Sequence, residues 1–132
     1  MKKPIAAVLT AAALSGATLL TTAPAMAHHS AAQFDFQNTV LVEGEVVRAR
    51  FANPHMRLIL EVTDEERGTR EIEFEGHSRN NMFRQGFRPD MFEAGDTITI
   101  RIAPMKSGAD GGYVTAVMTP DGTQIGNVTG AD

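Results

Sequence analysis

Apolar and polar residues alternate with a period of two over several segments of this chain. The alternation is clearest on either side of Gly44, between Val40 and Phe51, where β-branched residues are frequent. Because successive side chains of a strand point to opposite faces, this period indicates β-strands. The pattern predicts strands over residues 39–51, 56–63, 69–75, 96–103 and 113–118. Their inward-facing side chains predict a core formed by Val46, Leu58, Leu60, Ile72, Phe74, Ile98, Ile100 and Val114.

The pattern changes between the third and fourth predicted strands. Residues 78–86 begin with a serine suited to helix capping, contain an apolar pair and end in a glycine, which predicts a short helix. Another turn of helix is expected at 89–92. Three strands, a helix and two strands are the order of a small five-stranded barrel, so the sequence predicts an all-β fold with minor α content, resembling an oligonucleotide/oligosaccharide-binding (OB) barrel.

Gly44 lies inside the first and longest predicted strand. A glycine there predicts a β-bulge or a sharp coil, as small barrels need at their corners. An open two-layer sandwich is the alternative architecture. The barrel is favoured because the long strand is glycine-bent and because closing the sheet removes its exposed edges.

The first 27 residues have the three parts of a secretory signal peptide. Lys2 and Lys3 form a basic head, a run of small and apolar residues follows, and Ala25-Met26-Ala27 provides a cleavage site. The apolar run is short for a membrane span, and Ser15 and Gly16 interrupt it. We therefore expect a signal peptide at 1–27, a segment bearing a histidine pair at 28–38 and a barrel domain at 39–132. The mature protein is expected in the periplasm or outside the cell, without a membrane span.

Composition narrows the classes of function. Of 132 residues, 105 remain after removal of 27, which suits one small domain. The twelve Lys and Arg include the two of the signal, so ten basic residues oppose sixteen acidic ones. That balance disfavours nucleic acid or an anionic membrane as a partner. The absence of cysteine excludes disulfides and thiolate metal sites.

The histidines are the residues best suited to chemistry. Cleavage after Ala27 would make His28 the first residue, so that its α-amine and Nδ1 atom chelate one metal ion. His29 adds a second imidazole, and His55, which follows Asn53-Pro54 at the start of a strand, is the candidate third ligand. Amine and imidazole donors favour copper, with zinc or nickel as further possibilities. The alternative is a tail without function at His28 and His29 and a turn residue at His55.

Two hypotheses of function follow. The first is an exported copper-binding protein that uses His28, His29 and His55. The second is an interaction module that docks on an exported protein or a small ligand, with the histidines incidental. No nucleophile, base and acid appear in a recognisable catalytic context, so we do not expect an enzyme. Whether His77, Arg84 and Arg88 form a further site is left open by the sequence.

Five short motifs occur in order along the chain: AHHS at the cleavage site, FANPH at 51–55, FEGHSRNNMFRQGF at 74–87, AGDTITI at 94–100 and TPDG at 119–122. Together they resemble an uncharacterised family of small exported bacterial proteins, known only as a domain of unknown function. In that family the aromatic residue before NPH is commonly Trp, where this chain has Phe51 and Ala52. His77 also departs from the family pattern. The resemblance implies a fold and a compartment and no activity.

Overall fold

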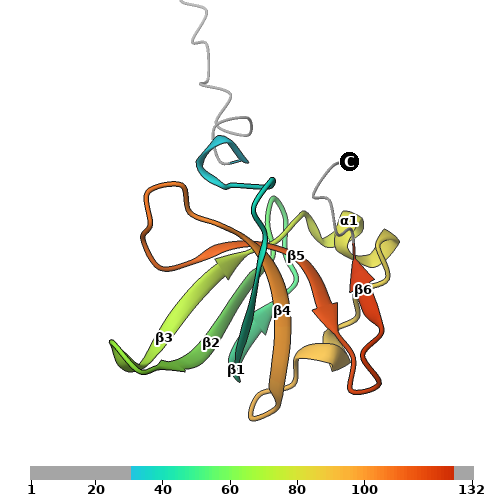
Figure 1. The fold of residues 1–132 in the computed structure, drawn as a ribbon. Coiled ribbons are helices and arrows are strands. Elements are labelled where there is room, and N and C mark those ends of the chain that lie inside the picture. The colour runs from blue at the N-terminus through green and yellow to red at the C-terminus, as the bar shows by residue number, and fades with distance from the viewer. Residues whose placement is uncertain (1–30, 127–132) are drawn as a thin grey trace, which may run out of the picture.

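The computed structural model describes residues 31–126, and its main element is a curved β-sheet (Figure 1). Its strands are β1 (Val40–Arg50), β2 (Arg57–Asp64), β3 (Gly68–Glu75), β4 (Thr97–Pro104), β5 (Gly112–Met118) and β6 (Gln124–Gly126). The five predicted strands are confirmed with shifts of only one residue at their ends. The three-residue β6 was not predicted, because it is too short to show a period.

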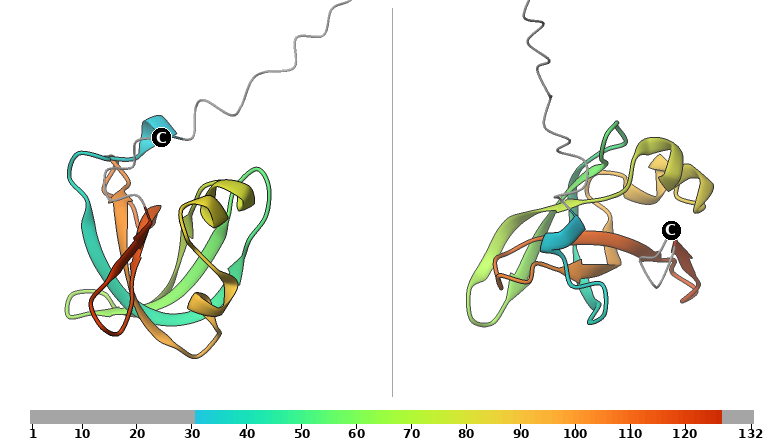
Figure 2. Two further views of the ribbon diagram at one scale, coloured as in Figure 1. Left: turned by 90° about the vertical axis from the view of Figure 1, so that its right-hand side faces the viewer. Right: turned by 90° about the horizontal axis from the view of Figure 1, so that it is seen from above.

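The sheet closes into a barrel. Its strand order is β3-β2-β1-β4-β5-β6, and β3 also pairs with β5 in parallel through Glu75 and Tyr113. β1 makes this closure possible because its first half pairs with β4 and its second half with β2. Figure 2 shows β1 curving around the lower end of the barrel. The predicted five-stranded barrel is therefore confirmed and the open sandwich is wrong; β6 is added beyond β5.

Gly44 lies where β1 changes from one partner strand to the other. A Cβ atom on this residue would lie 2.7 Å from the carbonyl oxygen of Glu61 on β2, so only glycine allows the two strands to approach this closely. The register of β1 against β2 is irregular between Val46 and Arg48. The predicted bulge therefore lies a few residues after Gly44, and the glycine itself provides the close approach.

Short helices connect β3 to β4 and cover one side of the barrel. They are α1 (Arg79–Arg84) and the 3₁₀ helix η3 (Pro89–Phe92), as predicted; another 3₁₀ helix, η2 (Ala31–Gln33), precedes β1. Ser78 occupies the N-cap of α1, but its side chain makes no capping hydrogen bond. The helical connection contributes buried side chains to the core through Met82, Phe87 and Phe92.

The core lies inside the barrel and extends under the helical connection. Its largest fully buried side chains are Phe74, Phe87, Met56, Leu58, Leu60, Met82, Ile100, Val46 and Val114. Seven of the eight predicted core residues are buried, and Ile98 is half-buried against them. No helix within residues 31–126 is long and apolar enough to cross a membrane.

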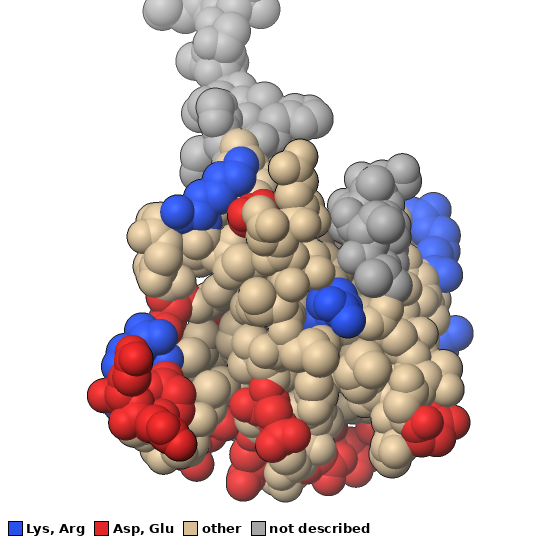
Figure 3. Space-filling view, viewed as in Figure 1, with Lys and Arg blue, Asp and Glu red and all other residues tan. Residues whose placement is uncertain are grey.

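Acidic side chains gather along the lower end of the molecule in the view of Figure 3. One row runs across three strands, because Glu61 on β2 stands directly opposite Glu45 on β1 and Glu71 on β3. All three glutamates are exposed. Like charges that face one another across strands oppose folding, so this row lowers the stability of the barrel.

Candidate metal centre

The loop between β1 and β2 places His55 beside the end of β3. Its Asn53–Pro54 peptide bond is cis. The backbone N–H of Met56 donates to the carbonyl of His77 (2.9 Å), and the N–H of Gly76 donates to the carbonyl of Met56 (2.9 Å). These two hydrogen bonds continue the β2–β3 pairing beyond the ends of both strands. As a result, the His55 side chain stands over Glu75 and Gly76.

Two acceptor oxygens face the Nδ1 atom of His55. The carbonyl oxygen of Gly76 is 3.3 Å from Nδ1, and the Oε1 atom of Glu75 is 3.1 Å from it. Both oxygens accept a hydrogen bond, so they favour the proton on Nδ1, and in the neutral ring Nε2 on the other side is then the nitrogen with the lone pair. The imidazole is 23% exposed. His55 therefore offers a lone pair from a ring that is partly open to solvent.

Glu75 is a buried carboxylate with an incomplete set of partners. Its side chain is 9% exposed, and the buried Oε1 atom has no hydrogen bond of good geometry in the described part of the chain, although Nδ1 of His55 lies close to it. The other oxygen, Oε2, lies 3.5 Å from Nη1 of Arg57, which also pairs with Glu73 at 3.0 Å. Arg57 thus balances part of the negative charge of Glu75 through Oε2, and His55 lies beside the other oxygen, Oε1.

An N-terminal arm, residues 31–39, is packed against the same end of the barrel. Its Phe34 and Phe36 rings lie 5.5 and 5.4 Å from the ring of Tyr113, between ring centres. The backbone of the arm also pairs with the β4–β5 connection, where Lys106 donates to the carbonyl of Gln33 (2.9 Å). Because Tyr113 is the β5 residue paired with Glu75, the arm is anchored next to the His55–Glu75 pair. Figures 1 and 2 show the arm, the loop 51–56 and α1 at the upper end of the barrel.

His77 has a structural role at the start of α1. The backbone N–H of Ser78 donates to its Nδ1 atom (2.8 Å), and the amide nitrogen of Asn81 lies 2.8 Å from Nε2. The ring also lies 6.4 Å from that of Tyr113. These contacts connect the start of the helix to Tyr113 on β5, and the position of His77 in the sequence did not indicate this structural role.

The predicted ligands are thus described only in part. His28 and His29 lie outside the described residues, whereas His55 is partly exposed, with its Nδ1 atom facing the Gly76 carbonyl and the Glu75 carboxylate. Within residues 31–126, no group of three His, Cys, Asp or Glu side chains is arranged to hold a metal ion. Sequence reasoning missed Glu75, since it is one of several glutamates in an alternating strand and its burial depends on Tyr113 of a distant strand.

Comparison with known proteins assigns the chain to a family. Residues 17–115 match the model of a family of unknown function (DUF6152). The chain belongs to this family. The matched region contains the His28-His29 pair, His55 and Glu75, and it ends before β6. No curated protein and no solved structure matched the chain.

Proposed function

We propose that this member of the family is an exported protein that binds a transition-metal ion, with copper favoured, through the mature N-terminal His28 and His29 and through His55. The observation that carries the proposal is the position of His55, whose Nδ1 atom faces the carbonyl of Gly76 and the carboxylate of Glu75. Histidines that bind metals commonly donate their second ring N–H to a carboxylate or a carbonyl, which fixes the tautomer and strengthens the ligand. His55 has both kinds of acceptor at Nδ1.

The anchored arm supports the same proposal. Phe34 is buried and packs on Tyr113, whose backbone pairs with Glu75. Only five residues separate Phe34 from His28. Residues 31–33 are helical, and an extended chain before them can reach by at most roughly 3.3–3.6 Å per residue, so the terminal amine and imidazole start from an arm that is anchored beside the His55–Glu75 pair.

The donor set suits the chemistry of copper. The α-amine and Nδ1 of His28 would close a chelate ring, and the imidazoles of His29 and His55 would complete a nitrogen-rich site. Imidazole ligands suit copper and zinc, and copper heads the order of affinity among divalent ions. All the ligands must be deprotonated to bind, so the affinity for the metal ion should fall as the pH drops through the range in which imidazoles titrate, about 6.5.

The experiment begins with mass spectrometry of the exported protein, which should find His28 as the first residue. The mature chain is then titrated with Cu(II) against a competing chelator, beside a copy that carries one extra N-terminal glycine. We expect the extra residue to weaken binding strongly, because the chelate ring is lost. His55→Ala should weaken binding moderately, and Glu75→Gln should weaken it about 10–100-fold if the carboxylate orients the ligand.

His77→Gln is the matched control, because it removes another imidazole at the same end of the barrel. It should leave the affinity for Cu(II) unchanged. Loose binding by the two terminal histidines alone would not support the proposal. Equal affinities of the mature and glycine-extended copies, together with no loss in the His55 variant, would contradict it.

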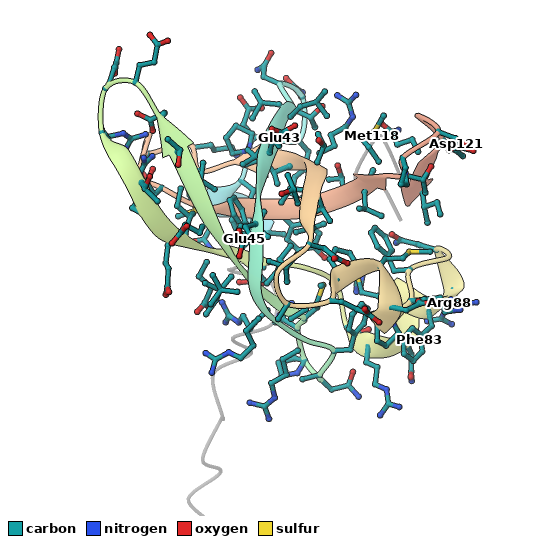
Figure 4. All side chains as sticks on the ribbon, turned by 90° about the horizontal axis from the view of Figure 1, so that it is seen from below. Glu43, Glu45, Phe83, Arg88, Met118 and Asp121 are labelled. Atoms are coloured by element: carbon teal, nitrogen blue, oxygen red, sulfur yellow. The ribbon has the colours of Figure 1, made fainter. Side chains whose placement is uncertain are left out.

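A second candidate function, an interaction module, is favoured by one surface beside α1. Arg79 and Arg88 place their guanidinium groups over the ring of Phe83, at 5.5 and 5.8 Å from its centre. Figure 4 shows Phe83 and Arg88 together, away from Glu43 and Glu45 on β1. In the described part of the chain, neither these two arginines nor Arg84 forms an ion pair. Such a surface suits an acidic segment of an exported partner, and it becomes the better explanation if the copper titrations fail as described.

A further inference from the structure

A pocket of about 430 Å³ opens between the β2–β3 hairpin and the β4–β5 connection. It exists because β3 and β5 pair only at Glu75 and Tyr113 and diverge toward the start of β3. Its apolar lining includes Leu41, Val62 and Ile102, and the side chain of Leu41 is 53% exposed. Neither His55 nor Glu75 lines this pocket.

Four charged side chains form the rim of the pocket. Arg70 binds Asp110 through two parallel hydrogen bonds, Nε to Oδ2 at 2.9 Å and Nη2 to Oδ1 at 3.0 Å. Arg70 also pairs with Asp64, and Arg67 places Nη1 2.9 Å from Oδ1 of Asp110. The hydrogen bonds from Arg70 lower the pKa of the Asp110 carboxyl, so this carboxylate stays ionised. The rim is therefore a pair of arginines that already holds a carboxylate in bidentate geometry.

Asp110 belongs to a loop, residues 107–112, that spans the gap between β3 and β5. Gly108 and Gly111 have positive φ angles in this loop. A Cβ atom on Gly111 would lie 3.0 Å from the carbonyl oxygen of Glu73, so the loop packs closely on β3. The carboxylate of Asp110 is 38% exposed, so it can be solvated when it is not bound to Arg70. Exchanging Asp110 for the carboxylate of a ligand on Arg70 therefore replaces one charge-assisted pair by another of the same kind.

We propose that this pocket binds an amphiphilic carboxylate, such as a medium-chain fatty acid. Its carboxylate takes the place of Asp110 on Arg70, and its alkyl chain lies on the apolar lining and covers Leu41. The volume falls within the range of small-molecule sites, and the charged rim lies directly beside the apolar side chains, so one ligand can contact both. Asp110 thus acts as an internal substitute for the ligand. This site is independent of the metal-binding function proposed above.

The test uses decanoate as the probe and the mature chain as the protein, with binding followed by isothermal titration calorimetry. We expect the wild type to bind decanoate, Asp110→Asn to bind it more tightly, and Arg70→Gln to lose affinity by about tenfold or more, as expected when a charge-assisted bidentate pair is removed. Arg84→Gln is the matched control, because it removes an arginine far from the pocket, and it should bind as the wild type does.

A second set of measurements keeps the test decisive if Arg70→Gln does not fold. Leu41→Asn changes an exposed side chain, so it should leave the fold intact and weaken decanoate binding. In NMR spectra, decanoate should shift the methyl resonances of Ile102 and Val62. The proposal is overturned if neither the wild type nor Asp110→Asn binds decanoate, if decylamine binds as tightly, or if the methyl shifts lie elsewhere.

Discussion

The substitution Gly44→Ala tests the feature that lets β1 bend around the barrel. Gly44 pairs with Ile98 of β4 on one side. On the other side, an added Cβ atom would lie 2.7 Å from the carbonyl oxygen of Glu61 and 3.1 Å from Cγ2 of Val62. The closer of these atoms belongs to the backbone of β2, so it moves only if the strand moves.

The expected cost follows from two opposing effects. A comfortable carbon–oxygen contact is about 3.3–3.6 Å, so β1 and β2 must separate by roughly half an ångström or more at this point. Forcing extra volume into a packed structure costs about 1–3 kcal/mol. Alanine in a strand is more favourable than glycine by roughly 0.5–1 kcal/mol, which offsets part of that cost. We therefore expect Gly44→Ala to lower the free energy of unfolding by about 1–2 kcal/mol.

The assay is urea denaturation of the mature chain followed by circular dichroism, with the midpoint and the slope of the transition compared between variants. Glu43→Ala is the control, because it alters the neighbouring exposed residue of the same strand and should change stability by less than about 0.5 kcal/mol. If Gly44→Ala were as stable as the wild type or more so, β1 and β2 would not approach closely at this residue, and our explanation of the bend would be refuted.

Three further predictions concern the core, the row of glutamates and the rim of the pocket. Phe74→Ala should cost about 3–5 kcal/mol in urea denaturation, because its ring is 1% exposed, and a near-neutral result would mean that β3 faces the other way. Glu61→Gln should raise the free energy of unfolding by roughly a few tenths of a kcal/mol by relieving repulsion, and added salt should shrink the difference. The pKa of Asp110 is lowered from the ordinary 3.8 by its hydrogen bonds to Arg70, so this carboxylate stabilises the folded protein above pH 3.8 and the stabilisation is lost as the pH falls through the lower folded pKa. An NMR titration of Asp110 should have its midpoint below 3.8, and in Arg70→Gln the midpoint should rise toward that value.

The sequence indicated the candidate metal site only through the types of its residues. His55 stands out because imidazole is a common ligand and because Asn53-Pro54 precedes a strand. Glu75, by contrast, belongs to a stretch in which Glu71 and Glu73 alternate with apolar residues and are exposed. Its burial follows from the pairing of β3 with β5, a contact between strands that are far apart in the chain.

The sequence by itself determined the strands, the short helix and nearly all of the core. These follow from alternation and from the positions of glycines, which are local patterns in the sequence. Export and the metal ligands at His28 and His29 stay predictions, since they fall outside the described residues.

Only the tertiary structure decided which polar groups meet. The closure of the barrel places Glu75 behind His55, sets Phe34 against Tyr113 and joins Arg70 to Asp110 across the mouth of a pocket. Each pair joins residues from different elements, and the distance between them depends on strand order and register. Strand order follows from the packing of the whole chain. The alternation within one strand shows that its hydrophobic face must be buried, but it does not determine which other strand will cover that face.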